Sequence, residues 1–168
     1  MPVVLIETGF IVTTKMSVHT KYLLDTNILL YLAHENAAFH SITSEAIRAL
    51  EPVAELYVSP QNLIEFWRAC TRPEANGGFN HSPQETAKRL DIIEARFPIL
   101  PDNPEIFTQW RSLVLAHQVS GRQVHDARLA AAMMVGTIPA ILTKNVADFR
   151  RYTMVEAVDP DDVMAEVT

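Results

Sequence analysis

The stretch "YLLDTN", residues 22–27, places a short apolar run directly before an aspartate, a threonine and an asparagine. The apolar residues suit a buried strand that ends at Asp25, and Thr26 and Asn27 then open a helix. In an open parallel sheet, ligands bind outside the carboxyl ends of the strands. We therefore expect the strand to deliver the Asp25 carboxylate to a functional site, where Thr26 and Asn27 orient it through hydrogen bonds.

The composition is that of one folded domain. The chain has 168 residues, of which 48% are hydrophobic and 20% charged, and a single domain commonly contains about 100 to 200 residues. No apolar run approaches the roughly 20 residues of a membrane-spanning helix, so no membrane association is expected. The lone Cys70 cannot form an internal disulfide, and the first residues do not resemble a secretory signal, which together favour a reducing cytoplasm.

The first residues differ from the rest of the chain. "MPVVLIETGFIVTTK", residues 1–15, is apolar, contains Glu7 and Gly9, and precedes a second methionine at Met16. We expect residues 1–20 to be an N-terminal extension outside the fold, and residues 21–168 to form the single domain.

The pattern of apolar residues predicts an α/β fold. Short apolar strand candidates are separated by stretches with helical spacing, and this order is typical of a mostly parallel central sheet with helices on both faces. The strand candidates are "KYLLD" (21–25), "ELYVS" (55–59), "FPIL" (97–100), "AILTK" (140–144) and, more weakly, "MVEAV" (154–158).

Turn and cap residues divide the chain at consistent points. Ser59, Ser82 and Asn103 each stand directly before a proline, which predicts three helix starts with a capping side chain followed by proline in the first turn. The run "RPEANGGFNHSP", residues 72–83, is rich in Gly, Asn and Pro, and predicts a surface loop between two helices.

Three further acids stand where they could join Asp25. Glu65 lies in "SPQNLIEFWRA" after the second strand, and Asp126 lies in "GRQVHDARLAAAMM", where a helix starts near His125. Asp148 lies in "ILTKNVADFRRY", just after the strand that ends at Thr143. Each acid follows a strand end or opens a helix, so all four could face one cleft.

Carboxylates gathered in one cleft would repel one another unless a cation offsets their charge. Oxygen ligands at that density suit Mg²⁺ or Mn²⁺, which coordinate oxygen at about 2.0–2.2 Å. The matching chemistry is metal-dependent hydrolysis of a phosphodiester. The net charge of −6 argues against a protein that binds nucleic acid by bulk attraction, but it does not exclude such an enzyme.

Four motifs in this order resemble the PIN-domain ribonucleases, and within them the VapC-type toxins of bacterial type II toxin–antitoxin pairs. The motifs are "LLDTNILLYL", "SPQNLIEFWRA", "VHDARLAA" and "ILTKNVADFRRY", and the resemblance runs over residues 21–158. It implies that Asp25, Glu65 and Asp126 hold Mg²⁺ or Mn²⁺. Many members carry a fourth aspartate where this chain has Asn145, and here the nearest carboxylate is Asp148.

The resemblance also implies a function. It implies a cytoplasmic endoribonuclease without an organic cofactor, which cleaves structured RNA such as tRNA or rRNA and leaves a 5′-phosphate and a 3′-hydroxyl. It further implies a homodimer that is silenced by a cognate antitoxin protein covering the acidic cleft. PIN domains also process RNA outside toxin–antitoxin systems, and the acids are alike in both settings.

Several residues near the acids have a structural interpretation as well as a functional one. His125 is expected to be a surface or packing residue rather than a general base, and Trp67 and Trp110 are expected to pack in the core rather than stack on bases. Arg128 is expected to form a structural ion pair. Any of the nearby cations, Arg128 included, could also hold the RNA backbone: Arg122, Arg128, Lys144, Arg150 and Arg151.

Two binding functions remain as alternatives to the nuclease. A receiver-type signalling domain also combines a parallel sheet, clustered acids, Mg²⁺ and a lysine after a late strand, and Lys144 stands at that place. It would need a phosphate-accepting aspartate at the end of a middle strand, and only Asp102, beyond Pro101, comes near. A PIN fold without catalysis, acting only as a binding module, also stays open because Asn145 replaces an acid.

Overall fold

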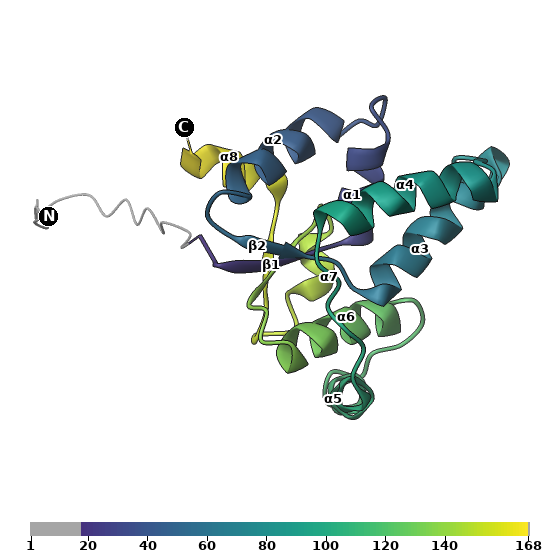
Figure 1. The fold of residues 1–168 in the computed structure, drawn as a ribbon. Helices are drawn as coiled ribbons and strands as arrows, with labels where there is room; N and C mark the ends of the chain where they lie inside the picture. The colour runs from purple at the N-terminus through teal and green to yellow at the C-terminus, as the bar shows by residue number, and fades with distance from the viewer. Residues whose placement is uncertain (1–17, 168) are drawn as a thin grey trace, which may run out of the picture.

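A four-stranded parallel sheet forms the centre of the protein. The computed structural model describes residues 18–167, and Figure 1 shows the sheet running through the middle of the fold. The strands are β1 (Lys21–Leu24), β2 (Glu55–Tyr57), β3 (Ala140–Leu142) and β4 (Glu156–Val158), in the spatial order β2-β1-β3-β4. All their pairings are parallel, which confirms the predicted fold class.

Helices cover both faces of this sheet. In Figure 1, α2 and α8 lie on one side together with α1, α3 and α4, whereas α5 and α6 lie on the other. The helices are α1 (Thr26–Ala33), α2 (His40–Leu50), α3 (Pro60–Thr71), α4 (Pro83–Arg96), α5 (Pro104–Ala116), α6 (Gln123–Val135), α7 (Val146–Phe149) and α8 (Pro160–Val167).

Side chains on the two faces of β1 pack in two separate apolar clusters, because successive side chains of a strand point to opposite faces. Leu24 packs with Phe66 of α3 in one apolar cluster. Leu23 packs with Ile141 of β3 and Met133 of α6 in the other. All of these side chains are fully buried. The alanines of α6 at positions 127, 130, 131 and 132 are buried in this second cluster.

The predicted helix starts are confirmed. The Ser59 hydroxyl accepts from Asn62 N at the start of α3, and the Ser82 hydroxyl accepts from Glu85 N at the start of α4. Asn103 Oδ1 accepts from Glu105 N at the start of α5. Each cap satisfies a backbone N–H that has no partner within its own helix.

One predicted strand is wrong. "FPIL", residues 97–100, forms no strand, and only a single parallel bridge joins Ile99 to Val58 at the edge of the sheet. Pro98 and Pro101 lack the N–H that a longer ladder requires. The structure also adds α8, which the strand and helix pattern did not indicate, and α6 begins at Gln123, slightly before His125.

The predicted loop at residues 72–83 lies between α3 and α4 and contains the short 3₁₀ helix η1 (Glu74–Asn76). It folds back on the end of α3, where Phe79 N donates to Ala69 O and His81 N donates to Cys70 O. Its residues are exposed or half-buried, in agreement with the predicted surface position.

Residues 1–17, most of the expected N-terminal extension, lie outside the described residues. The described residues just before β1 contact the fold: His19 Nε2 lies 2.7 Å from Glu156 Oε2, and Thr20 O accepts from Glu55 N. Among residues 18–167, no helix is both long and apolar enough to cross a membrane.

Candidate active site

Asp25 lies at the carboxyl end of β1, between this strand and β3. The strand order changes direction at this point, because the chain leaves β1 for β2 on one side and later returns to β3 on the other. The Asp25 backbone N–H donates to Leu142 O, which continues the β1–β3 ladder by one step. The predicted delivery of Asp25 to the sheet edge is therefore confirmed.

The Asp25 carboxylate is held by three donors. Thr26 N donates to Oδ1 at 2.7 Å, and Oδ2 accepts from Asn27 Nδ2 at 2.8 Å and from the Thr143 hydroxyl at 2.7 Å. Burial raises the pKa of Asp25, the three hydrogen bonds oppose that rise, and the negative charge of Glu65 adds to it. The predicted roles of Thr26 and Asn27 are confirmed.

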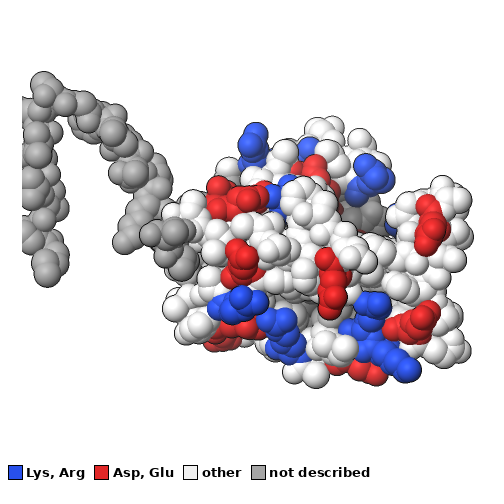
Figure 2. Space-filling model, turned by 90° about the horizontal axis from the view of Figure 1, so that it is seen from above, with Lys and Arg blue, Asp and Glu red and all other residues white. Residues whose placement is uncertain are grey.

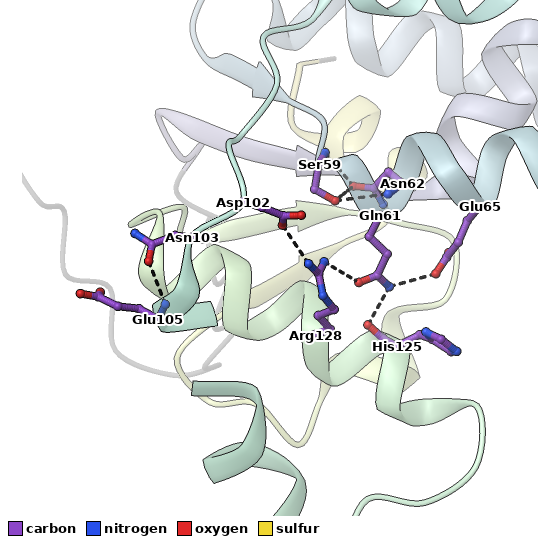
Figure 3. Close-up of polar contacts among 9 residues, drawn as sticks. All are labelled: Ser59, Gln61, Asn62, Glu65, Asp102, Asn103, Glu105, His125 and Arg128. Atoms are coloured by element: carbon purple, nitrogen blue, oxygen red, sulfur yellow. Dashed lines mark hydrogen bonds and ion pairs between the residues drawn. The ribbon is translucent and has the colours of Figure 1, made fainter. Parts of the chain in front are cut away.

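Glu65 projects from the second turn of α3, and Thr26, which donates to Asp25, also donates to Glu65. Its Oε2 accepts from the Thr26 hydroxyl at 3.1 Å, and its Oε1 accepts from Gln61 Nε2 at 2.9 Å (Figure 3). These contacts place Glu65 beside Asp25 instead of in a surface pair with Arg68. The α3 helix, which follows β2, thereby brings an acid to the carboxyl end of β1.

Asp126 and Asp148 approach the site from the other face of the sheet. Asp126 is in the first turn of α6, and Asp148 is in the short α7 that follows β3. Burial and the negative charges of Asp148, Asp25 and Glu65 together raise the pKa of Asp126 to about 6, and the positive charge of Arg122 opposes that rise. The charges of the other three predicted acids therefore all act on Asp126.

A cleft of about 830 Å³ opens above these groups. Glu65, Asp126 and Asp148 line it, whereas Asp25 is buried and is not part of its wall. The cleft also contains cations and neutral polar groups, so both signs of charge meet in it. Its remaining lining residues are Gln61, Ile64, Arg68, Asp102, Arg122, Gln123, His125, Arg128 and Asn145.

The acids offer a set of oxygen donors that suits a hard divalent cation. Within residues 18–167, no three His, Cys, Asp or Glu side chains are arranged closely enough to hold a metal ion as they stand. Two observations nevertheless fit such an ion. The mutual repulsion that raises the pKa of Asp126 would be offset by a cation, and Asp25 and Glu65 are already oriented by neutral donors.

The two candidates for the fourth acidic position both lie at the cleft. Asn145 and Asp148 both line it, and the Asn145 backbone N–H donates to the Thr143 hydroxyl at 2.9 Å. Of the neighbouring charges that raise the pKa of Asp126, Asp148 has the largest effect. Asp148 therefore acts on another predicted acid of the site, whereas the side chain of Asn145 is uncharged.

Other expectations have mixed outcomes. Arg128 forms the expected ion pair, with Nη2 at 2.8 Å from Asp102 Oδ1, but it also lines the cleft. His125 is exposed, and its carbonyl oxygen accepts from Gln61 Nε2. Trp110 is half-buried against the α6 core, and its indole N–H donates to Val124 O. Trp67 is also half-buried.

Three polar residues of the site were not identified from the sequence as holding the acids. Thr143 holds Asp25, Gln61 holds Glu65, and Asn62 Nδ2 donates to the Thr26 hydroxyl at 3.3 Å. The only signal was local: "SPQN" opens a helix, and Thr143 ends a strand. Their partners lie far away in the sequence, so spacing could not reveal the contacts.

Fold and site together define a class of protein. The chain matches the PIN domain family over residues 22–153, and it belongs to that family. No curated protein matches the chain by sequence.

Solved structures share the fold. One is VapBC-1 from nontypeable Haemophilus influenzae, with 22% identity, a TM-score of 0.63, and coverage of 84% of this chain and 98% of that one. Another is VapBC2 from Rickettsia felis bound to a promoter DNA fragment, with 16% identity, a TM-score of 0.63, and coverage of 83% and 98%. A third is VapC20 from Mycobacterium tuberculosis, a toxin that cleaves the sarcin-ricin loop, with 16% identity, a TM-score of 0.55, and coverage of 86% and 94%.

The family match argues against the receiver-type alternative, and so does the position of Lys144. Its amino group lies 2.8 Å from Asp159 Oδ1 and 2.6 Å from Asp161 Oδ2, and neither of these acids lines the cleft. A receiver lysine would instead contact a phosphate held among the clustered acids.

Proposed function

We propose that this protein is a Mg²⁺- or Mn²⁺-dependent endoribonuclease and the toxin of a VapBC-type toxin–antitoxin pair. The observation that carries the proposal is that Glu65, Asp126 and Asp148 line one cleft beside the buried Asp25. Burial and the charges of the other three acids together raise the pKa of Asp126 to about 6. An unpaired acidic cluster of this kind is costly for a fold and is typical of functional sites.

Asp25, Glu65, Asp126 and Asp148 would hold the cation. Bound there, Mg²⁺ or Mn²⁺ supplies Lewis-acid stabilisation of the charge that develops on the phosphate during hydrolysis. The chain itself keeps the acids oriented: Thr143 and Asn27 hold Asp25, and Thr26 joins Asp25 to Glu65. The acids bind the ion and do not transfer protons among themselves.

The cleft rather than the overall charge would attract RNA. In the view of Figure 2, acidic and basic side chains are interspersed over the surface, without a large area of one charge sign. In the cleft, Arg68, Arg122 and Arg128 lie among the acids. Arginine binds phosphate through its forked donors, so these residues are suited to holding the RNA backbone beside the acids.

Protein partners are part of the proposal. Two of the three structures compared above are described as VapBC proteins, and a further similar structure is described as a toxin–antitoxin complex from Klebsiella pneumoniae. Ile64, which lines the cleft, is 70% exposed, and Phe107 of α5 is 64% exposed. These apolar side chains are suited to contacts with a cognate antitoxin that covers the cleft and with a second copy in a homodimer. The proposed substrate, tRNA or rRNA, rests on the resemblance to VapC-type toxins.

The purified protein, free of antitoxin, should cleave total cellular RNA at discrete sites in Mg²⁺ or Mn²⁺ but not in EDTA. Asp25→Asn and Asp126→Asn should abolish cleavage while the protein stays folded. Asp91→Asn, which changes an exposed acid on α4, is the matched control. RNA that stays intact under every condition would instead support a PIN domain that only binds partners. Cleavage restricted to one precursor RNA would support an RNA-processing nuclease outside toxin–antitoxin systems.

A further inference from the structure

Gln61 connects the two helices that carry Glu65 and Asp126. Its side-chain nitrogen donates to Glu65 Oε1 at 2.9 Å and to the carbonyl oxygen of His125, next to Asp126, at 3.0 Å. Its side-chain oxygen accepts from Arg128 Nη1 at 3.2 Å. Figure 3 shows this amide between α3 and α6, and only 8% of the residue is exposed.

The partners of Gln61 fix the orientation of its amide. A guanidinium can only donate hydrogen bonds, whereas a carboxylate and a backbone carbonyl can only accept them. Only one of the two amide orientations therefore satisfies all three contacts, and in that orientation both amide hydrogens are used. The Gln61 amide is thereby a rigid donor aimed at Glu65.

Arg128 is fixed in turn by Asp102, whose Oδ1 accepts from Nη2 at 2.8 Å. The contacts run from Asp102 through Arg128 and Gln61 to Glu65 (Figure 3). Because the neutral amide stands between Arg128 and Glu65, the carboxylate is oriented by a hydrogen bond without being neutralised in an ion pair. The Glu65 carboxylate is therefore available to bind a metal cation.

We propose that Gln61 is a positioning residue that holds the Glu65 carboxylate for metal binding, with Arg128 acting through it. The inference rests on the proposed function, since it assigns Glu65 to the metal. Within residues 18–167, the Glu65 side chain has one further hydrogen bond, from the Thr26 hydroxyl to its other oxygen. Loss of Gln61 therefore leaves the carboxylate held at one oxygen only.

The test is a calorimetric titration of the antitoxin-free protein with Mn²⁺, without RNA. Gln61→Met keeps the length of the side chain but removes all three hydrogen bonds. It should weaken Mn²⁺ binding about 10- to 100-fold, the usual cost of losing a residue that orients a metal ligand. Gln84→Met, which changes an exposed glutamine on α4, is the matched control and should leave the affinity unchanged.

Arg128→Met provides a second test with a distinctive sign. If Arg128 were only a cation near the site, its removal would strengthen Mn²⁺ binding by relieving repulsion. If it fixes the Gln61 amide, its removal should weaken Mn²⁺ binding about threefold or more, and it should add no further loss in the Gln61→Met background, since residues that act through one another are non-additive.

The outcomes separate the inference from the function. If Gln61→Met and the unaltered protein bind Mn²⁺ equally well, the role of Gln61 is overturned. This holds even if the unaltered protein cleaves RNA as proposed. Tighter Mn²⁺ binding by Arg128→Met would overturn the part assigned to Arg128. An unaltered protein that binds no Mn²⁺ would overturn both the metal site and the inference, whereas Gln61-dependent Mn²⁺ binding without RNA cleavage would overturn the nuclease alone.

Discussion

The hydroxyl of Thr143 donates to Asp25 Oδ2 at 2.7 Å, across 118 residues of sequence. The same oxygen of Thr143 accepts from the Asn145 backbone N–H at 2.9 Å and from Asn27 Nδ2 at 3.2 Å. A single buried hydroxyl thus joins the end of β3, the start of α1 and the first acid of the site. Thr143 therefore lies at the carboxyl end of the sheet, next to the cleft.

Thr143→Val keeps the shape of the side chain but removes this hydroxyl. We expect it to lower the free energy of unfolding by about 1–3 kcal/mol, because a buried donor and acceptor lose their partner. It should also raise the pKa of Asp25 further, since the Thr143 bond lowers it. Thermal unfolding and RNA cleavage rates are the measurements.

Thr43→Val is the matched control for that variant. Thr43 is also fully buried, but within residues 18–167 its hydroxyl has no hydrogen-bond partner. Its replacement should leave stability unchanged or increase it, and cleavage should not change. If Thr43→Val destabilises the protein as much as Thr143→Val does, the loss at Thr143 is a packing effect and not the loss of its hydrogen bonds.

The Asp25 position could be predicted because it depends on local sequence: an apolar run, an acid and a capping segment. The helix starts at Ser59, Ser82 and Asn103 could be predicted for the same reason. The contact of Gln61 with Arg128 joins positions 67 residues apart, so it depends on how α3 and α6 pack. The segment 97–100 has strand-like side chains, but its prolines and its edge position limit it to one bridge.

Metal binding should depend on pH through Asp126. Burial and the charges of Asp148, Asp25 and Glu65 raise its pKa from 3.8 to about 6, so the proton competes with the cation below that pH. We expect Mn²⁺ affinity to fall as the pH is lowered from 7 to 5. An affinity that stays constant over this range would show that Asp126 is not a ligand.

The stability of the metal-free protein should change in the opposite direction. A raised pKa means that the folded chain binds the Asp126 proton more tightly than the unfolded chain does. This contribution is fully present below pH 3.8 and is lost as the pH rises through about 6. In EDTA, Asp126→Asn should therefore remove a fall in unfolding temperature between about pH 4 and pH 6, which paired thermal scans would detect.

The fourth acidic position can be assigned by two variants. Asp148→Asn should weaken Mn²⁺ binding and lower the pKa of Asp126, because Asp148 is the neighbouring charge that raises it most. Asn145→Ala removes only a neutral side chain at the cleft and should have the smaller effect on Mn²⁺ affinity. The opposite ranking would assign the position to Asn145.

Arg122 is the cleft cation best placed to bind RNA near the acids. It stands at the start of α6, is exposed, lines the cleft, and lowers the pKa of Asp126. Arg122→Gln should raise the KM for RNA about tenfold, which corresponds to the loss of one charged hydrogen bond to phosphate.

Steady-state cleavage of a defined RNA at pH 6 and pH 8 would separate the two effects of Arg122. The KM should rise at both pH values, whereas kcat should fall mainly at pH 6, because removal of the cation raises the pKa of Asp126. Arg150→Gln is the matched control, since Arg150 is exposed beside α7 but does not line the cleft. A larger rise in KM for Arg150→Gln than for Arg122→Gln would place the RNA backbone along α7 and outside the cleft.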